Sequence, residues 1–363
     1  AIITTLLLGF YIIPDCSVKL SVFFVVIGLL LFLTFVSYKF LLPGRYGKKY
    51  YPSIILLLII FFCSKFYFSS SELYKKHKIT YESEGLLGQV TVVDHYCTKR
   101  PHSSLHVNGI TQTKTDIETG FSLWRYIHIF SFASAVKPEG SKALILGIGG
   151  GSLVKEFMDL GFEVDICELD QRMVDVSANQ FNAPVSSADI YIDDARHYIK
   201  TTQNKYDIVV FDIALGEIQP SHIFTIEAFN ELKKILKDDK AFVFINYTDH
   251  SLNKIASKSI YLTIEKSGFI IKAFDTKKDA ALFMALLKEP EKSSFKVFRS
   301  NPCCLKFGTP QQLLSMHTVD TDDAMILTDD KPVLDIINLA TNRYYRNLSI
   351  KNYIIKRIEG DAF

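Results

Sequence analysis

Carboxylates follow the ends of several apolar, β-prone runs in this chain, and a glycine-rich stretch separates the first two runs. Residues 143–146 (ALIL) have the pattern of a buried strand, and residues 162–167 form the second such run, which ends at Glu168. The stretch after the first run contains Gly147, Gly149, Gly150 and Gly151. Glycines let backbone approach a ligand where a Cβ would clash, and a carboxylate after the second strand can hold a ribose diol. The pattern predicts a site for a nucleoside-containing cofactor.

Further acids follow the next two predicted strands. Asp193 and Asp194 come after residues 190–192, and Asp212 ends the strand predicted at 206–211. Because ligands of an open parallel sheet bind outside the carboxyl ends of its strands, these acids and Glu168 are expected at one edge. Each acid alone could be a helix N-cap. That alternative is strong for Asp193 and Asp194, which precede a predicted helix, and weaker for Glu168, since Glu is a poor N-cap.

The glycine stretch differs from those of phosphate-bearing cofactors. It lacks the third glycine at dinucleotide spacing, and no P-loop lysine follows it. We therefore expect S-adenosylmethionine or its decarboxylated form, which carries adenosine and a sulfonium without phosphate. No cysteine pair has zinc-ligand spacing, so no metal is expected. The formal net charge of +2 gives no argument for nucleic acid as a partner.

The elements that position these residues fall into four predicted parts. Residues 1–70 are expected to be a transmembrane segment, 80–120 a small β-element with a hairpin at Asn108, 121–290 a Rossmann-like nucleoside-binding domain and 291–363 a C-terminal extension. In the third part, strands alternate with helices. This alternation predicts an α/β fold with a mostly parallel sheet and helices on both faces.

Long apolar runs near the start of the chain predict a lipid bilayer as partner. Residues 20–42 are long enough to cross a membrane, and residues 53–68 follow after a short turn. Residues 1–14 are also apolar and are either the remainder of an earlier span or the start of a processed chain, so we expect two or three spans. By the positive-inside rule, the basic residues in the turn favour a soluble domain outside the cytoplasm, whereas those after the second span favour a cytoplasmic one. Since the cofactor is made in the cytoplasm, we expect a multi-pass protein of the inner membrane with a cytoplasmic soluble domain.

Several motifs together resemble the spermidine synthase family, the polyamine aminopropyltransferases, and in particular its membrane-fused bacterial branch. The segments that carry the resemblance are 107–112 (VNGITQ, like "DG-x-x-Q"), 147–152 (GIGGGS, like "GGGDG"), 168–170 (ELD, like "E-x-D"), 194–196 (DAR), 206–212 (YDIVVFD, like "YD-x-I-x-x-D") and 328–333 (TDDKPV). The resemblance implies the class I methyltransferase fold, with a mostly parallel seven-stranded sheet.

The resemblance also implies roles for single residues. Glu168 would hold the ribose, Asp194 would take the adenine amino group, and Asp212 would be the general base. Gln112 and the glycine stretch would complete the cofactor site. Decarboxylated S-adenosylmethionine is the family's co-substrate, and a small-molecule amine or other nucleophile is the expected acceptor. Assembly as a homodimer or a membrane complex stays open.

Three departures from the family pattern concern the substrate. Leu215 stands where polyamine synthases carry a second Asp, Leu87-Gly88 replaces "YQ", and Ser152 replaces the acid of the glycine stretch. A diamine needs carboxylates for two ammonium groups, so putrescine is a doubtful acceptor. Glu217 could supply one of them. Three hypotheses follow: an aminopropyltransferase-like enzyme, a methyltransferase that uses S-adenosylmethionine, and a non-catalytic membrane-tethered nucleoside sensor or assembly subunit.

Overall fold

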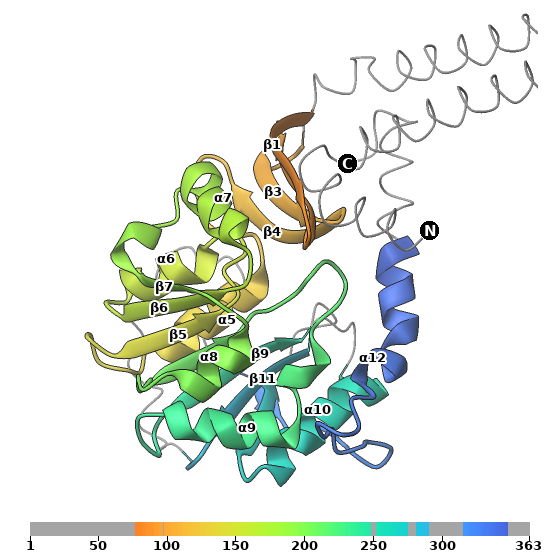
Figure 1. The fold of residues 1–363 in the computed structure, drawn as a ribbon. Coiled ribbons are helices and arrows are strands. Elements are labelled where there is room, and N and C mark those ends of the chain that lie inside the picture. Colours follow the sequence, from red (N-terminus) through yellow and green to blue (C-terminus); the bar gives the residue numbers. More distant parts are fainter. Residues whose placement is uncertain (1–76, 97, 248–251, 275–280, 290–314, 348–363) are drawn as a thin grey trace, which may run out of the picture.

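The computed structural model describes residues 77–96, 98–247, 252–274, 281–289 and 315–347. Their strands form two sheets (Figure 1). The membrane spans predicted within residues 1–70 lie outside these residues. Among the helices that are described, none combines the length and the apolar character needed to cross a bilayer.

The first sheet is the small antiparallel β-element. Its strands run in the order β1 (His77–Gly85), β2 (Gly88–His95), β3 (His102–Val107) and β4 (Ile110–Asp116). Asn108 and Gly109, with φ of 52° and 80°, form the turn between β3 and β4, as an Asn-Gly pair favours. The predicted antiparallel element and its hairpin are therefore confirmed.

The second sheet has the Rossmann-like, methyltransferase-type arrangement, in the order β12-β10-β11-β9-β8-β5-β6-β7. Its strands are β5 (Lys142–Leu146), β6 (Glu163–Glu168), β7 (Asp189–Ile192), β8 (Ile208–Phe211), β9 (Phe242–Tyr247), β10 (Ile270–Phe274), β11 (Ala281–Leu286) and β12 (Met316–His317). The strands β7, β6, β5, β8 and β9 are parallel, and β11, β10 and β12 add antiparallel pairs. Among the described residues the sheet has eight strands and not the seven that the resemblance implies, because the two-residue β12 pairs with β10 at its edge.

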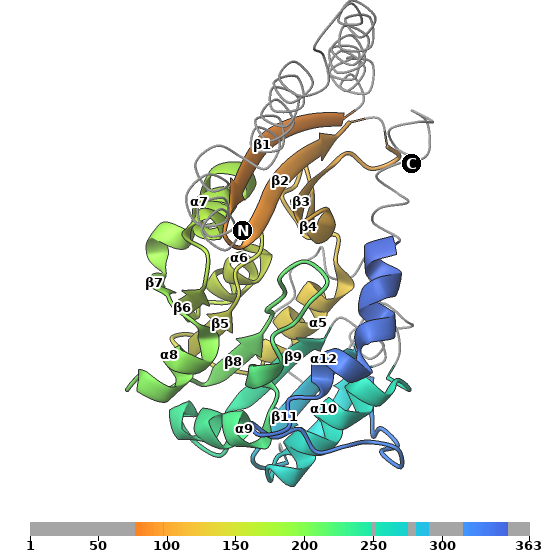
Figure 2. The same cartoon turned by 45° about the vertical axis from the view of Figure 1, so that its right-hand side comes forward.

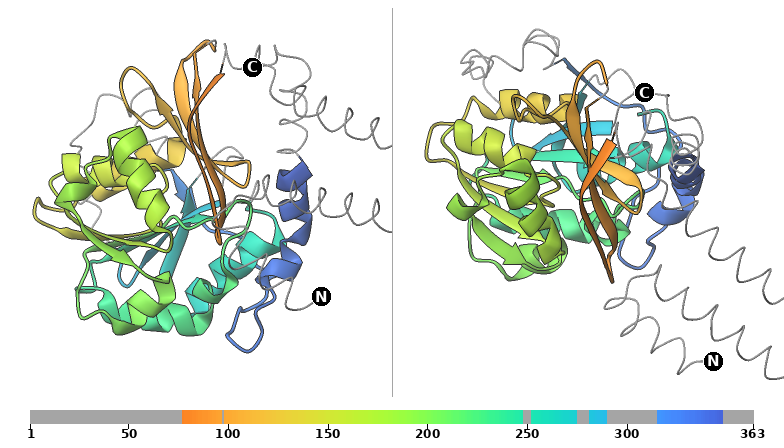
Figure 3. Two further views of the ribbon diagram at one scale, coloured as in Figure 1. Left: turned by 45° about the horizontal axis from the view of Figure 1, so that its top comes forward. Right: turned by 90° about the horizontal axis from the view of Figure 1, so that it is seen from above.

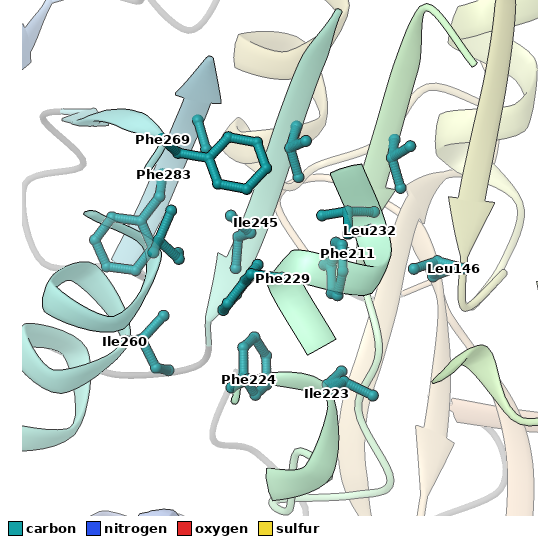
Figure 4. Packing of buried hydrophobic residues seen from close by; sticks show 14 of the residues in the cluster. Leu146, Phe211, Ile223, Phe224, Phe229, Leu232, Ile245, Ile260, Phe269 and Phe283 are labelled. Atoms are coloured by element: carbon teal, nitrogen blue, oxygen red, sulfur yellow. The ribbon is translucent and has the colours of Figure 1, made fainter. Parts of the chain in front are cut away.

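Helices cover both faces of this sheet. The helices are α5 (Arg125–Ser134), α6 (Ser152–Asp159), α7 (Gln171–Phe181), α8 (Ala195–Thr201), α9 (Ile226–Leu232), α10 (Ile255–Lys266) and α12 (Leu334–Ile337), with short 3-10 turns at Val185–Ser187, Ser221–Ile223 and Lys233–Ile235. Along β5 the side chains alternate between two cores, Ile145 in one and Leu146 in the other. Helices α5, α6 and α7 pack in the core of Ile145. Helices α8, α9 and α10 pack in the core of Leu146, which Figure 4 shows around Phe211 and Phe229.

The β1–β4 sheet stands over the carboxyl edge of the parallel strands (Figures 2 and 3). Hydrogen bonds join the two parts: the Gly150 amide donates to Thr113 Oγ1 of β4 over 2.9 Å, and Gln112 Nε2 donates to the carbonyl of Gly216 over 3.0 Å. Residues 339–347 are helical and follow α12. Most of the predicted site residues line the space that these parts enclose.

Candidate functional site

A cavity of about 770 Å³ lies between the β1–β4 sheet and the carboxyl edge of the parallel strands. Its wall includes most of the residues predicted for the site, namely Gln112, Gly147, Gly149, Gly150, Glu168, Asp193, Asp194 and Asp212. Gly151 is not part of this wall. The carboxyl ends of β6, β7 and β8 thus bring together acids that lie up to 44 residues apart in sequence, as the strand order requires.

The glycine stretch allows close packing at three places. A Cβ on Gly147 would lie 2.4 Å from the carbonyl oxygen of Asp212, and one on Gly150 would lie 2.7 Å from Thr113 Cγ2. Gly151 has φ of 74°, is the N-cap of α6, and would collide with Ala183 if it carried a Cβ. Gly147 and Gly150 therefore shape the cavity wall, while Gly151 packs α6 against the chain after α7.

Glu168 is held in place by backbone amides. Oε2 accepts a hydrogen bond of 2.9 Å from the Ile148 amide, and Oε1 accepts one of 3.0 Å from the Asp170 amide. Burial raises the pKa of this carboxyl, and the two amides act against that rise. Each carboxylate oxygen can accept more than one hydrogen bond, so Glu168 keeps acceptor capacity toward the cavity.

The acids after β6 and β7 act as helix caps. Asp170 caps α7 by accepting from the Arg172 amide, and Asp194 caps α8 by accepting from the amides of Arg196 and His197. Asp193 Oδ2 lies 2.6 Å from Nδ1 of His197, and Asp194 Oδ2 lies 3.0 Å from His222 Nε2. The capping alternative thus applies to Asp194, which also lines the cavity.

Asp212 is fixed from both sides at the end of β8. Tyr126 Oη of α5 donates to its Oδ2 over 2.9 Å, and Asn246 Nδ2 of β9 donates to its Oδ1 over 2.8 Å. Burial raises the pKa of Asp212, and the bonds from Asn246 and Tyr126 lower it. Burial and the nearby carboxylate raise the pKa of Tyr126, so its phenol keeps the proton that it donates. Such a positioned carboxylate can accept a proton from a nucleophile within reach.

The loop after Asp212 closes one side of the cavity. Leu215 and Ile218 pair in a tight turn, and Leu215 is 40% exposed. Glu217, which we expected to supply a carboxylate, lines the cavity, and its Oε1 accepts a hydrogen bond of 2.8 Å from Arg346 Nε. Tyr345 also lines the cavity. The helical residues near the end of the described chain therefore contribute to this wall.

Several of these site residues were not predicted as such. Tyr126 carried no local signal for its role, because its bond to Asp212 spans 86 residues. Asn246 did carry a usable signal, because it is the polar residue at the carboxyl end of the apolar strand β9. No local pattern indicates the contact between Arg346 and Glu217. In the parts of the chain that the structure describes, no cluster of His, Cys, Asp or Glu could hold a metal ion.

The fold and the arrangement of acids at the strand ends define an α/β protein of the Rossmann-like, methyltransferase type. Residues 127–275 match the family model described as "Spermine/spermidine synthase domain". The crystal structure of a probable spermidine synthase from Corynebacterium glutamicum has a TM-score of 0.53 at 18% identity, with 69% of this chain and 95% of that chain covered. At this identity the likeness shows the fold.

Two curated relatives show the range of the sequence matches. Polyamine aminopropyltransferase 2 from Aquifex aeolicus is 29% identical over 178 residues, which are 46% of this chain and 35% of that protein. A protein named N-terminal histidine N-methyltransferase from Emericella nidulans is 32% identical over 113 residues, 30% of this chain and 20% of that protein. The chain spans about a third or less of the length of these two relatives.

Proposed function

We propose that this protein transfers a group from an S-adenosyl sulfonium nucleoside to an amine, with aminopropyl transfer as the first assignment. One observation carries the proposal: Asp212, held by Tyr126 and Asn246, shares a cavity with Glu168. A fixed base and a candidate ribose acceptor in one cavity are what such a transfer needs. The spermine/spermidine synthase match of residues 127–275 supports it.

The residues of the cavity fit an adenosyl nucleoside. Glu168 would accept from the ribose hydroxyls with the lone pairs that its amide bonds leave. Gly149 and Gly150 would let the ligand lie against backbone, and Gln112 would lie beside it. Asp193 and Asp194 would be at the adenine end. In this assignment Asp194, the N-cap of α8, also presents a carboxylate oxygen to the adenine.

Asp212 would accept the proton of the attacking nitrogen. The sulfonium supplies an activated carbon and a good leaving group. The nitrogen forms a bond to that carbon, the carbon–sulfur bond breaks with its electron pair on sulfur, and the proton leaves nitrogen for Asp212 Oδ1 or Oδ2. Tyr126 and Asn246 hold the carboxylate for this step and cannot take the proton themselves. The protein's tasks are thus positioning and deprotonation.

We propose that putrescine is a poor acceptor for this cavity. The apolar Leu215 stands in the loop position of a second carboxylate, and Glu217 is bonded to Arg346. The second ammonium of a diamine would therefore have to share Glu217, whose Oε2 alone lacks a described partner, with Arg346 in a partly desolvated place. We therefore propose an acceptor with one amine at Asp212 and a different group at its other end.

Methyl transfer from S-adenosylmethionine is the second candidate. Ser152 replaces the acid of the glycine stretch, and its Oγ is buried in the cavity wall without a hydrogen-bond partner among the described residues. That change removes a negative charge close to the place where the methionine carboxylate would lie. The relative from Emericella nidulans, whose name gives N-methyl transfer, supports keeping this candidate.

Binding followed by turnover tests the proposal. Calorimetric titrations with 5′-methylthioadenosine, S-adenosylmethionine and its decarboxylated form come first, and a panel of amines with each sulfonium donor comes second. Transfer to an amine that is lost in Asp212→Asn supports the proposal. Nucleoside binding without any transfer supports the non-catalytic sensor, and absence of nucleoside binding contradicts both.

Residues 1–70 are proposed to tether this site to the inner membrane, with the soluble domain in the cytoplasm. The length and apolar character of residues 20–42 support the proposal. Retention of the full chain in the membrane pellet after carbonate extraction, together with protease resistance of the soluble domain in intact spheroplasts, is the expected result.

A further inference from the structure

Two nitrogen donors directly before or at the start of α5 line the cavity without partners. Nε1 of Trp124 and Nε of Arg125 are buried, and neither has a hydrogen-bond partner among the residues described. Leaving a buried donor unpaired costs about 1–3 kcal/mol, and more for a charged group. Because both residues line the cavity, a ligand that accepts hydrogen bonds there would satisfy these donors once the side chains turn toward it.

Arg125 also supplies a positive charge that nothing described nearby neutralises. It is the only lysine or arginine among the described residues that line the cavity, and it forms no ion pair with a described carboxylate. The carboxylates of that wall have other partners. They are Glu168 and Asp212, described above, Asp170 with Arg172, Asp193 with His197, Asp194 with His222, and Glu217, whose Oε1 pairs with Arg346 while its buried Oε2 has no described partner. The guanidinium is therefore available to an anionic group in the cavity.

A third group belongs to the neighbouring helix. Ser152 Oγ is buried in the same wall without a described partner, at the first residue of α6. Helices α5 and α6 lie side by side, and Ser131 of the first donates to Glu156 of the second over 2.9 Å. Neither helix start is capped by the side chain of its N-cap residue, Trp124 or Gly151.

We propose that Trp124 and Arg125, with Ser152 of the same cavity wall, form a subsite for a carboxylate carried by one of the two substrates. A planar guanidinium matches the two oxygens of a carboxylate, and the indole adds one more donor. A dianionic phosphate fits less well among the six carboxylates of the same wall. The inference rests on the proposed function and adds a substrate class to it.

Two sources of the carboxylate are compatible with this subsite. It can belong to the methionyl tail of the sulfonium nucleoside, which is then S-adenosylmethionine with its carboxylate retained. It can instead belong to an amino-acid-like acceptor, which presents its amine to Asp212 and its carboxylate to Arg125. Either source explains why a cation lines this cavity together with the apolar Leu215.

Two matched ligand pairs test the subsite and identify its source. S-adenosylhomocysteine and its decarboxylated form differ by one carboxylate, and so do ornithine and putrescine, which are titrated with 5′-methylthioadenosine bound. We expect the acid of one pair to bind the full-length protein about 10-fold or more tightly, the value of a hydrogen bond to a charged group. In Arg125→Gln that preference should fall below about 2-fold, while Arg125→Lys should keep part of it.

The affinity for 5′-methylthioadenosine, which has no carboxylate, provides the control. It should be equal in the parent and in Arg125→Gln, and a large loss would show that the variant is misfolded. In that case Trp124→Phe, which removes only one donor, is used in place of Arg125→Gln. It should reduce the preference for the carboxylate-bearing ligand of the pair. Equal binding within both pairs, or a preference that survives these variants, overturns the subsite. Failure of 5′-methylthioadenosine to bind the parent overturns the proposed function as well, so the two failures are distinguishable.

Discussion

Tyr126 Oη lies 2.9 Å from Oδ2 of Asp212 and joins the first turn of α5 to the carboxyl end of β8. With Asn246 on the other oxygen, the carboxylate has one orientation set by two elements that pack on it independently. A base that is pre-positioned in this way does not have to be ordered when the substrate binds. The first two predictions address this pair.

Asp212→Asn should lower the rate of transfer by ~10² or more and leave nucleoside affinity within about 2-fold of the parent, because the amide keeps the shape and loses the base. Initial rates at saturating donor, together with calorimetry, measure both quantities. Asp175→Asn is the matched control, since Asp175 is exposed on α7 and accepts a bond from Gln171. A parent-like rate in Asp212→Asn would make Asp212 structural only.

Tyr126→Phe should shift the acid side of the pH–rate profile upward. Burial raises the pKa of Asp212, and the Tyr126 hydroxyl counteracts this rise by donating to the ionised form. Without that donor the pKa rises further, so the base becomes protonated, and activity is lost, at a higher pH than in the parent. A profile measured from about pH 5 to 9 checks this. An unchanged acid side would show that another group governs it.

Glu168→Ala should weaken nucleoside binding by roughly 1.5–3 kcal/mol, and Glu168→Gln should do less harm because one acceptor oxygen remains. The raised pKa of Glu168 adds a second expectation. Affinity in the parent should fall as pH is lowered through that pKa, while Glu168→Gln should lack this dependence. Calorimetry at several pH values measures both, and unchanged affinity in a folded Glu168→Ala would refute the ribose assignment.

The sequence was sufficient to predict which acids share a sheet edge, since strand ends follow from apolar runs and parallel strands end on the same side. Glu168, Asp194 and Asp212 line one cavity for that reason. Contacts between distant elements were beyond this reasoning. The approach of Tyr126 to Asp212 depends on where α5 packs, and that of Arg346 to Glu217 depends on the path of the chain after α12.

The eighth strand illustrates the same limit in the fold. Met316 and His317 pair with Phe274 and Ala273, but a two-residue strand has no periodicity that a sequence can reveal. The turn at Asn108-Gly109, by contrast, was predictable because its positive φ angles demand these residue types. Turns that demand particular residue types and strands with a periodic apolar pattern could thus be predicted from the sequence, whereas the pairing of distant segments could not.

Arg196→Met should lower the free energy of unfolding by about 1–3 kcal/mol, because Asp329 loses its cation and Glu231 keeps only the exposed Lys200. Arg196 Nη1 lies 2.6 Å from Asp329 Oδ1, and its Nε lies 2.8 Å from Glu231 Oε2. Lys200→Met is the control: Lys200 contacts the same Glu231 at 3.6 Å but is 54% exposed, so the expected loss is under about 1 kcal/mol. Denaturant titrations measure both free energies of unfolding. Equal losses in Arg196→Met and Lys200→Met would show that the buried ion pairs of Arg196 do not stabilise the fold.

The same cluster predicts a pH dependence of stability. Hydrogen bonds from Arg196 lower the pKa of Asp329 and of Glu231 below their ordinary values. Since both pKa values are lower in the folded state, the contribution is present above the unfolded-state pKa and is lost as pH falls through the folded-state pKa. Arg196→Met should therefore lose less stability than the parent between about pH 6 and pH 3. If the free energy of unfolding fell equally with pH in the parent and in Arg196→Met, the ion pairs of Arg196 would not be the source of this pH dependence.

The parent protein should form little or no spermidine from putrescine and decarboxylated S-adenosylmethionine, and Leu215→Asp should raise affinity for the diamine. Leu215 lines the cavity and is 40% exposed, so a new ion pair there is partly screened and should gain roughly 2- to 5-fold in affinity. Leu215→Asn, which is polar without charge, should not produce this gain. Calorimetry with 5′-methylthioadenosine bound measures the affinities, and product analysis by mass spectrometry measures spermidine. Robust spermidine formation by the parent would mean that Glu217 exchanges Arg346 for the substrate ammonium, which Arg346→Gln should then enhance.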